Sequence, residues 1–121
     1  MSAARRPIRI KRAYDAPARG DGYRVLVDRL WPRGLSKAKA KLDEWNKDIA
    51  PSPDLRIWFG HDPERFAEFS RRYRAELSRN PREVARISSL AAKRPLTLVY
   101  AAKDPVCNHA IVLQAFLESL R

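Results

Sequence analysis

Two short apolar runs constrain the fold of this chain more than any other feature of the sequence. Residues 25–27 read VLV within the segment YRVLVDRL at 23–30, and residues 96–102 read LTLVYAA. A run in which apolar residues follow one another without polar alternation is typical of a strand that is covered on both faces. A third strand is predicted at 8–11, because IRIK alternates apolar with basic residues and so has one buried face.

Weaker signals follow the strand that YRVLVDRL predicts over 23–30. The residues WPRG at 31–34 end it, because proline and glycine both disfavour continuation of a strand. The serine that opens 36–40 is a suitable cap for a short helical turn. The segment 42–51 is expected to contain another short extended piece, with Leu42 and Trp45 turned inward.

Four helix starts are marked by a capping residue that precedes a proline. The cap side chain accepts a hydrogen bond from an unpaired backbone N–H, and a proline in the first turn loses nothing because its nitrogen would have no partner there. Glu83, three residues after the third cap, completes a capping box. The four pairs are Ser52-Pro53, Asp62-Pro63, Asn80-Pro81 and Asp104-Pro105.

Apolar residues recur every three or four positions after three of these caps, which predicts one buried stripe on each of three helices. The stripes are Phe66, Phe69, Tyr73 and Leu77; Val84, Ile87 and Leu90; and Val106, Ala110, Leu113, Leu117 and Leu120. Strands that are separated by helices predict an α/β fold. We therefore expect one small three-layer domain over 1–121, with a mostly parallel sheet of three to four strands flanked by helices and a flexible tail at 1–6.

The composition predicts a folded cytoplasmic protein. Hydrophobic residues make up 45% and charged residues 32% of the chain, which is ordinary for a globular domain. No apolar run is long enough to cross a bilayer, and the basic start of the chain lacks the apolar core of a secretory signal. The single cysteine, Cys107, fits a reducing compartment.

The net charge is the most unusual part of the composition. Lys and Arg number 25 against 14 Asp and Glu, for a formal net charge of +11. Such a charge attracts polyanions non-specifically, so association with nucleic acid is the alternative function. It would depend on the basic residues near the N-terminus: Arg5, Arg6, Arg9 and Arg12. The sequence holds no helix-turn-helix, zinc knuckle or RNA-binding aromatic motif that would support this alternative.

A ligand site is predicted where the strands end, because ligands of open parallel sheets bind beyond the carboxyl ends of the strands. Two polar segments occupy that place, VDRLWPRG at 27–34 and YAAKDPVCNHA at 100–110. A helix capped by Asp104 would also present unpaired N–H groups to an anion. An anionic, phosphate-type small molecule is therefore the expected ligand. The predicted binding residues are Arg29, Trp31, Arg33, Arg56, Lys103, Asp104 and Asn108.

Catalysis at this site would use Asp28 or His109 as the acid or base. Each has a simpler interpretation, since the carboxylate could pair with an arginine and a lone histidine is often only a satisfied one. Lys11 and Tyr14 would lie beside the same predicted site, at the end of the first strand. Cys107 is interpreted as a small filler, and the three tryptophans as packing residues of which one could stack a ligand. The sequence holds no nucleophile–base set and no metal-ligand spacing, so turnover and any cofactor stay open.

Four motifs carry a resemblance to a known family: DRLWPRG at 28–34, WxKDxAPS at 45–52, LRxWFxH at 55–61 and YAAKD…NHA at 100–110. Nearly all of the chain beyond residue 7 resembles the YeaO-like branch of the domain-of-unknown-function 488 family. The resemblance implies a bacterial protein of no established activity.

A longer branch of that superfamily has two cysteines and a histidine near the last strand. By this resemblance His109 stands at the histidine, whereas Tyr100 and Asn108 stand at the cysteine positions. Cys107 is out of register with both, so the resemblance implies no thiol or zinc mechanism.

Three classes of function are therefore predicted in order. The first is a small-molecule binding domain or enzyme with the anion pocket described above, and the second is a basic protein associated with nucleic acid. The third is an interaction module without a pocket, in which alanine at Arg33 or His109 would leave partner binding intact.

Overall fold

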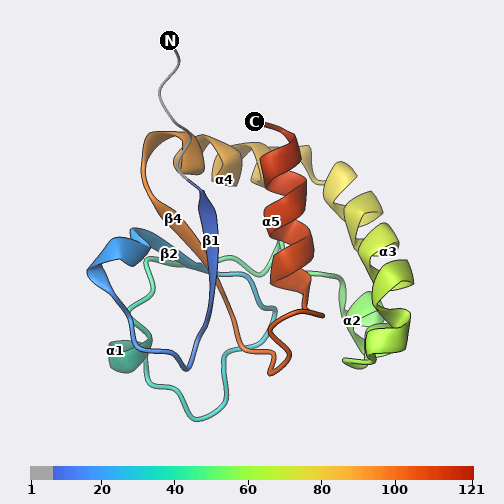
Figure 1. Cartoon of the computed structure of the whole chain (residues 1–121), viewed down its shortest axis with the longest axis horizontal. Helices are drawn as coiled ribbons and strands as arrows, with labels where there is room; N and C mark the ends of the chain where they lie inside the picture. The colour runs from blue at the N-terminus through green and yellow to red at the C-terminus, as the bar shows by residue number, and fades with distance from the viewer. Residues whose placement is uncertain (1–6) are drawn as a thin grey trace.

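A parallel sheet organises the protein. The computed structural model describes residues 7–121, and the tail expected at 1–6 lies outside the described residues. Within them, four strands form one sheet in the order β1-β4-β2-β3, and each neighbouring pair is parallel (Figure 1). The bounds are β1 Ile8–Arg12, β2 Tyr23–Leu26, β3 Glu44–Trp45 and β4 Leu96–Tyr100. The predicted α/β fold with a small parallel sheet is confirmed.

Helices connect the strands. Over residues 7–121 the α-helices are α1 Lys37–Ala40, α2 Pro53–Phe59, α3 Phe66–Ser78, α4 Pro81–Lys93 and α5 His109–Ser119, and the 3-10 helices are η1 Arg19–Asp21 and η2 Pro63–Arg65. The cap predicted at Ser52 is confirmed, because its Oγ accepts from the N–H of Leu55 at 3.2 Å. Asp62 also caps, but it begins η2, which leads into α3. In the described part of the chain no helix has the length and apolar character needed to span a bilayer.

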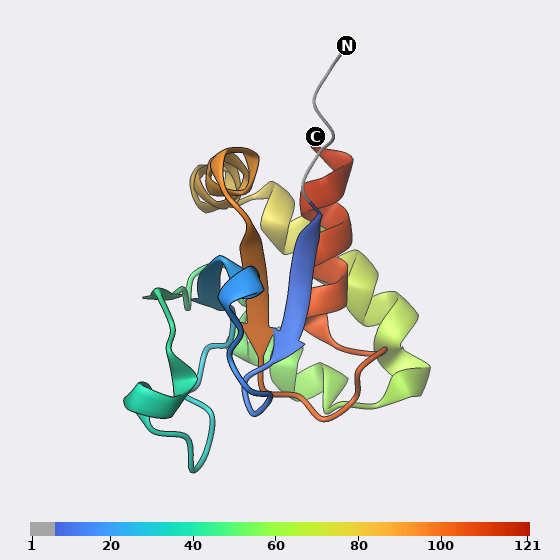
Figure 2. The same ribbon diagram turned by 60° about the vertical axis from the view of Figure 1, so that its left-hand side comes forward.

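The main core lies between one face of the sheet and helices α2 to α5. Ile8, Val25 and Leu98 point into it from the strands and are fully buried. The stripes predicted on α3 and α4 supply Tyr73 and Ile87, which have no exposed surface. Figure 2 shows α3 and α5 on one side of the strands and α1 on the other.

The opposite face of the sheet has a thinner cover. Leu26 and Val99 point to it and pack against Trp31, Leu35 and Leu42 from the segments on either side of α1. Leu42 therefore turns inward, as predicted. Strand β4 is central and buried along its whole length, which agrees with its unbroken apolar sequence.

Trp45, which we expected to turn inward, lies at the surface with 36% of its area exposed. Its Nε1 donates to the carbonyl oxygen of Asp28 at 2.8 Å, and the ammonium of Lys47 lies 4.1 Å from the centre of its ring. A polar partner for the indole N–H and a cation on the ring hold this side chain at the edge of the fold.

The capping box predicted at Asn80 and Glu83 does not form. Asn80 donates from Nδ2 to the carbonyl oxygen of Asp48 at 3.0 Å, and its side chain makes no capping bond. Glu83 accepts from Asn46 at 2.8 Å and pairs with Arg86. Both side chains thus serve tertiary contacts, which the local pattern could not indicate.

The last helix begins four residues later than predicted. Asn108, not Asp104, is its N-cap, with Oδ1 accepting from the N–H of Ile111 at 2.9 Å. Asp104 closes a separate turn before the helix, and its Oδ1 accepts from the N–H groups of Val106 and Cys107 at 2.8 and 2.9 Å.

This later start corrects the predicted stripe on the last helix. Ala110, Leu113 and Leu117 are fully buried, as expected. Val106 lies in the turn before the helix and is 65% exposed, and Leu120 lies just past the helix and is 54% exposed. The two ends of the predicted stripe are therefore wrong.

Candidate functional site

The two polar segments predicted to meet do line one cavity. Strands β2 and β4 are neighbours and run parallel, so the segments that follow them leave the sheet at the same edge, the lower one in Figure 2. The cavity at this edge has a volume of about 660 Å³. All nine residues that the sequence analysis assigned to the site line it.

Asp28 joins the two segments. We predicted a strand over 23–30, but β2 ends at Leu26. The N–H of Val27 makes the last backbone hydrogen bond to β4, to the carbonyl oxygen of Val99 at 2.9 Å. The side chain of Asp28 then replaces the backbone as acceptor: its Oδ2 accepts from the N–H of Ala101 at 2.9 Å. A carboxylate thus caps the end of β4 inside the cavity.

His109 lies against this carboxylate. Its Nε2 is 2.7 Å from Asp28 Oδ1 and 3.0 Å from the carbonyl oxygen of Val27. The ring N–H is directed at the carbonyl, so Oδ1, although nearer, accepts no hydrogen bond of good geometry and is buried. Because both neighbours are acceptors, Nε2 carries a hydrogen. The ring of Tyr73 meets the imidazole edge-on from the core, at 6.5 Å between centroids.

The second ring nitrogen of His109, Nδ1, has no hydrogen-bond partner within residues 7–121. At Nε2, a carbonyl and a carboxylate hold the imidazole in one orientation, and the Asp28–His109 pair lines the cavity. The simpler interpretation of Asp28, pairing with an arginine, is wrong: its partners are Ala101 and His109.

Three other predicted site residues serve the fold itself. Arg29 donates from Nε to the carbonyl oxygen of Pro51 at 3.1 Å and from Nη2 to that of Ala50 at 3.4 Å. Asp104 and Asn108 act as caps, as described above, and Asn108 also donates to the carbonyl oxygen of Asp104. The N–H of Cys107, followed by that of Val106, lowers the pKa of Asp104 below its ordinary value. These side chains shape the cavity and leave few donors for a ligand.

Arg33, Arg56 and Lys103 are different. All three line the cavity and are exposed, and within the described part of the chain their side chains make no hydrogen bond or ion pair. They come from the segment after β2, from α2 and from the segment after β4. We call them the cationic rim.

Aromatic side chains line the interior. Phe59 and Phe69 stack at 4.2 Å between centroids and are almost fully buried. Trp31 is held by a bond from its Nε1 to the carbonyl oxygen of Leu35 at 2.6 Å and by an edge contact with Trp45 at 5.3 Å. We call Trp31, Phe59, His61 and Phe69 the aromatic wall.

The sequence analysis missed His61 as a site residue. Its backbone has φ of 58°, in the left-handed region that few residues other than glycine adopt. Gly60 before it, which ends α2, has φ of 54°, so two successive left-handed residues turn the histidine into the cavity. The motif LRxWFxH contained this residue, but the periodicity of α2 gave no reason to place it at the site.

Tyr14 lines the cavity as expected, but Lys11 does not. The Tyr14 hydroxyl donates to the carbonyl oxygen of Arg33 at 2.8 Å and so ties the β1 exit to the segment after β2. Lys11 instead pairs with Asp21 at 3.0 Å and donates to the carbonyl oxygen of Ala16 at 2.9 Å. Of the three tryptophans, Trp31 alone lines the cavity, and Arg72 covers the ring of Trp58 at 4.2 Å.

The chemistry available in the cavity is limited. No Ser, Thr or Cys is among the described residues that line it. Over residues 7–121, no three His, Cys, Asp or Glu side chains lie together in a way that could hold a metal ion. The arrangement offers a carboxylate–histidine pair, a cationic rim and an aromatic wall.

A small parallel α/β domain with a cationic cavity at the carboxyl ends of its strands is thus the class that the fold and site define. A family model described as the inactive DUF488-N3 subclade matches residues 7–120. The chain belongs to this family, which confirms the predicted YeaO-like resemblance.

Two relatives match the chain over most of its length. The chain is 49% identical over 113 residues to the "Uncharacterized protein YeaO" of Escherichia coli (strain K12), which covers 93% of this chain and 98% of that protein. It is 41% identical over 110 residues to the "Uncharacterized protein Rv3073c" of Mycobacterium tuberculosis (strain H37Rv), covering 91% of this chain and 92% of that protein. No solved structure matches the chain significantly.

Proposed function

We propose that this protein is a binding domain for an anionic small molecule, with the anion held at the cationic rim. The observation that carries the proposal is that three exposed cations from distant segments line one cavity and have no partner in the described part of the chain. Guanidinium and ammonium groups bind phosphate and carboxylate oxygens through charge-assisted hydrogen bonds.

The charges around the cavity support an anion over a neutral or cationic ligand. Its lining has four cationic side chains, Arg29 and the cationic rim, against the two carboxylates of Asp28 and Asp104. Both carboxylates already accept from backbone N–H groups, so part of their acceptor capacity is used within the fold. The local surplus is positive.

The lining favours binding over turnover. A serine, threonine or cysteine nucleophile would have to lie beside a base such as His109. No Ser, Thr or Cys is among the described lining residues, and Asn108 occupies the helix cap beside His109 with both ends of its amide bonded. The description of the matching family as inactive agrees with a ligand-binding role.

Calorimetric titration with ribose 5-phosphate and with inorganic pyrophosphate tests the proposal. The triple variant R33A/R56A/K103A should weaken binding about tenfold or more, since one charge-assisted bond contributes about 1.5–3 kcal/mol. The matched control is R74A/R79A/R82A, which removes the same charge from exposed arginines that do not line the cavity. Equal weakening by both triple variants would show that the effect depends on net charge alone. Failure of both anions to bind would refute the proposal.

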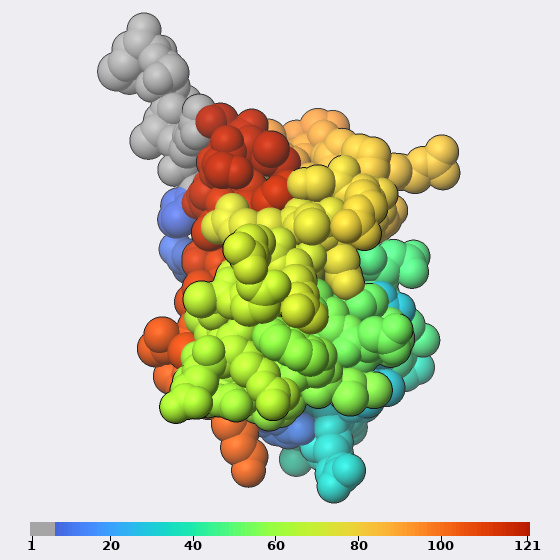
Figure 3. Space-filling view, turned by 90° about the vertical axis from the view of Figure 1, so that its right-hand side faces the viewer, coloured from blue at the N-terminus to red at the C-terminus, as the bar shows by residue number. Residues whose placement is uncertain are grey.

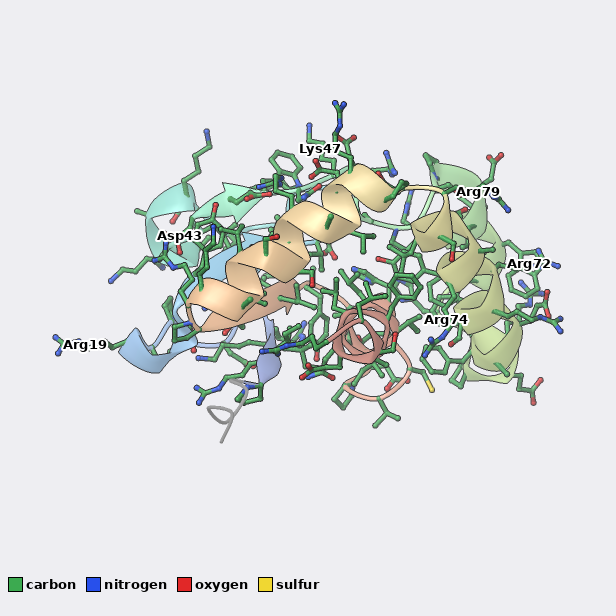
Figure 4. The ribbon with its side chains drawn as sticks, turned by 90° about the horizontal axis from the view of Figure 1, so that it is seen from above. Arg19, Asp43, Lys47, Arg72, Arg74 and Arg79 are labelled. Atoms are coloured by element: carbon green, nitrogen blue, oxygen red, sulfur yellow. The ribbon has the colours of Figure 1, made fainter. Side chains whose placement is uncertain are left out.

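A second candidate, nucleic-acid binding, is favoured by a different surface. Arg74 in α3, Arg79 just past its end and Arg82 at the start of α4 are exposed and make no side-chain hydrogen bond or ion pair within the described residues. Figure 3 shows the face formed by α3, and Figure 4 labels Arg74 and Arg79, which lie on different sides of this helix. Exposed arginines without protein partners suit a phosphate backbone.

The N-terminal arginines support this candidate less. Arg9 donates to the carbonyl oxygen of Gly20 at 3.1 Å and Arg12 to that of Ala102 at 3.0 Å, while Arg5 and Arg6 lie outside the described residues. Binding of a single-stranded oligonucleotide should fall steeply with salt, and R74A/R79A/R82A should lower the slope of log K against log salt by about 0.7 for each phosphate that an arginine no longer neutralises. A salt-independent affinity would end this candidate.

A further inference from the structure

We propose that the ligand of this cavity is a nucleoside monophosphate, with its base against the aromatic wall and its phosphate at the cationic rim. This inference rests on the anion-binding function proposed above and names the class of ligand. Three features of the cavity carry it: its volume, its charge and its aromatic lining.

The volume calls for an organic body on the anion. At about 660 Å³ the cavity is in the range that encloses small organic ligands, about 300–1,000 Å³, and far exceeds what an inorganic phosphate fills. A ligand that met the cationic rim alone would leave most of this space unused. The remaining contacts must come from the part of the ligand that carries no charge.

The aromatic wall suits a flat ring. Phe59 and Phe69 stack on each other and are almost fully buried, so they support the wall from behind, and the rings open to a ligand are those of half-buried Trp31 and exposed His61. Trp31 is fixed in place by its hydrogen bond to Leu35 and its contact with Trp45. These rings are held by the fold itself, so a base could stack on the wall without ordering it first. Stacking of a base on an aromatic side chain tolerates any base, because each base has a π-face.

His61 adds an exposed ring to this wall. Its centroid lies 6.1 Å from that of Phe59, and its left-handed backbone holds it in the cavity lining. A non-glycine residue in this conformation stores strain, and such residues cluster at ligand sites. Within the described residues the imidazole has no hydrogen-bond or ion-pair partner, which leaves its ring and its nitrogens for a base.

The charge surplus suits a phosphate monoester better than a carboxylate. Four cationic side chains face two carboxylates around the cavity. A phosphate monoester carries a charge of about −1.5 to −2 at neutral pH, which matches that surplus, whereas a carboxylate carries half of it. Arg29 uses Nε and Nη2 on backbone carbonyls, so most of the donors for the phosphate come from the cationic rim.

The experiment compares three ligands that share parts: adenosine 5′-monophosphate (AMP), ribose 5-phosphate and adenosine. Calorimetry should show that AMP binds about tenfold or more tightly than ribose 5-phosphate, because stacking of the base adds to the phosphate contacts. Adenosine should bind more weakly than AMP by a similar factor. In NMR spectra AMP should shift the indole N–H signal of Trp31, which lines the cavity, and leave that of Trp58 unchanged.

Two variants separate the base from the phosphate. H61N removes the imidazole and keeps a residue that tolerates the left-handed backbone, so it should weaken AMP about threefold or more and leave ribose 5-phosphate unchanged. R33A/R56A/K103A should weaken both phosphates. Urea unfolding midpoints equal to that of the unmodified protein would show that both variants are folded.

The outcomes distinguish this inference from the function on which it rests. Equal affinity for AMP and ribose 5-phosphate, with sensitivity to the rim variant, would overturn the nucleotide and leave anion binding standing. Equal affinity for AMP and adenosine would overturn the phosphate assignment. Failure of both phosphates to bind would overturn the proposed function itself.

Discussion

Two groups of charged side chains in this protein behave in opposite ways. Lys11 in β1, Asp21 just before β2 and Arg24 in β2 are saturated with partners: Arg24 Nη1 donates to Asp21 at 2.6 Å, and Lys11 donates to the same carboxylate at 3.0 Å. We call these three residues the Asp21 network. The cationic rim beyond the carboxyl ends of the strands has no such partners within residues 7–121.

The difference shows which charges the fold requires. Arg24 is only 4% exposed, and its remaining donors reach the carbonyl oxygens of Lys41 and Ala40 at 3.1 and 2.9 Å. Burying a charge is costly unless each donor is satisfied, so this degree of pairing is what makes its burial tolerable. The rim cations are solvated and carry no such requirement, which leaves them for a ligand.

The strongest test of this contrast is removal of Arg24. R24M keeps much of the aliphatic volume but leaves Asp21 with one partner fewer in a buried position and two backbone carbonyls unpaired. We expect a loss of about 3–5 kcal/mol in the free energy of unfolding, measured by urea denaturation. The matched variant R33M, at the exposed rim, should change it by less than about 0.5 kcal/mol. Similar losses in the two variants would remove the distinction.

Acid should weaken the Asp21 network selectively. Burial alone would raise the pKa of Asp21, but hydrogen bonds from Ala18, Lys11 and Arg24 outweigh it and hold the pKa below the ordinary 3.8. A lowered pKa in the folded state contributes stability that is complete above the unfolded value and is lost as the pH falls through the folded one. The difference in unfolding free energy between D21N and the unmodified protein should therefore be constant above about pH 5 and shrink below about pH 4.

Urea titrations at pH 7, 4 and 3 measure this difference. The control is D48N, which removes an exposed carboxylate that lies outside the network. A D21N difference that grows on acidification would contradict the sign of the shift.

The sequence predicted which two segments meet at the site, because their positions depend on strands that simple periodicity reveals. The runs at 25–27 and 96–100 could only be covered strands, and parallel neighbours bring their carboxyl ends to one edge. That alone placed Asp28, Arg33, Lys103 and His109 around one cavity. No side-chain detail was needed for this step.

The rest depended on tertiary partners. Asp104 and Asn108 are four residues apart, and both suit the N-cap of a helix. Tertiary contacts select Asn108, because His109 at the start of the helix contacts Asp28 and Val27. Arg24 follows the pattern of a strand residue, and nothing near it in sequence shows that Asp21 and two carbonyls enclose it. His61 depends on a left-handed turn that no periodicity predicts.

The smallest effect should come from the rim variant R33A/R56A/K103A, and its sign sharpens the contrast most. The protein has a formal net charge of +11, so removing three unpaired cations relieves repulsion. We expect each residue to change the unfolding free energy by less than about 0.5 kcal/mol, and the sum to be slightly stabilising at low salt. In about 1 M salt, where the screening length falls to about 3 Å, that gain should vanish. A loss above about 1 kcal/mol, large against the usual effect of surface substitutions, would mean that the rim belongs to the fold in the way Arg24 does, and the cavity would then have no charge to offer a ligand.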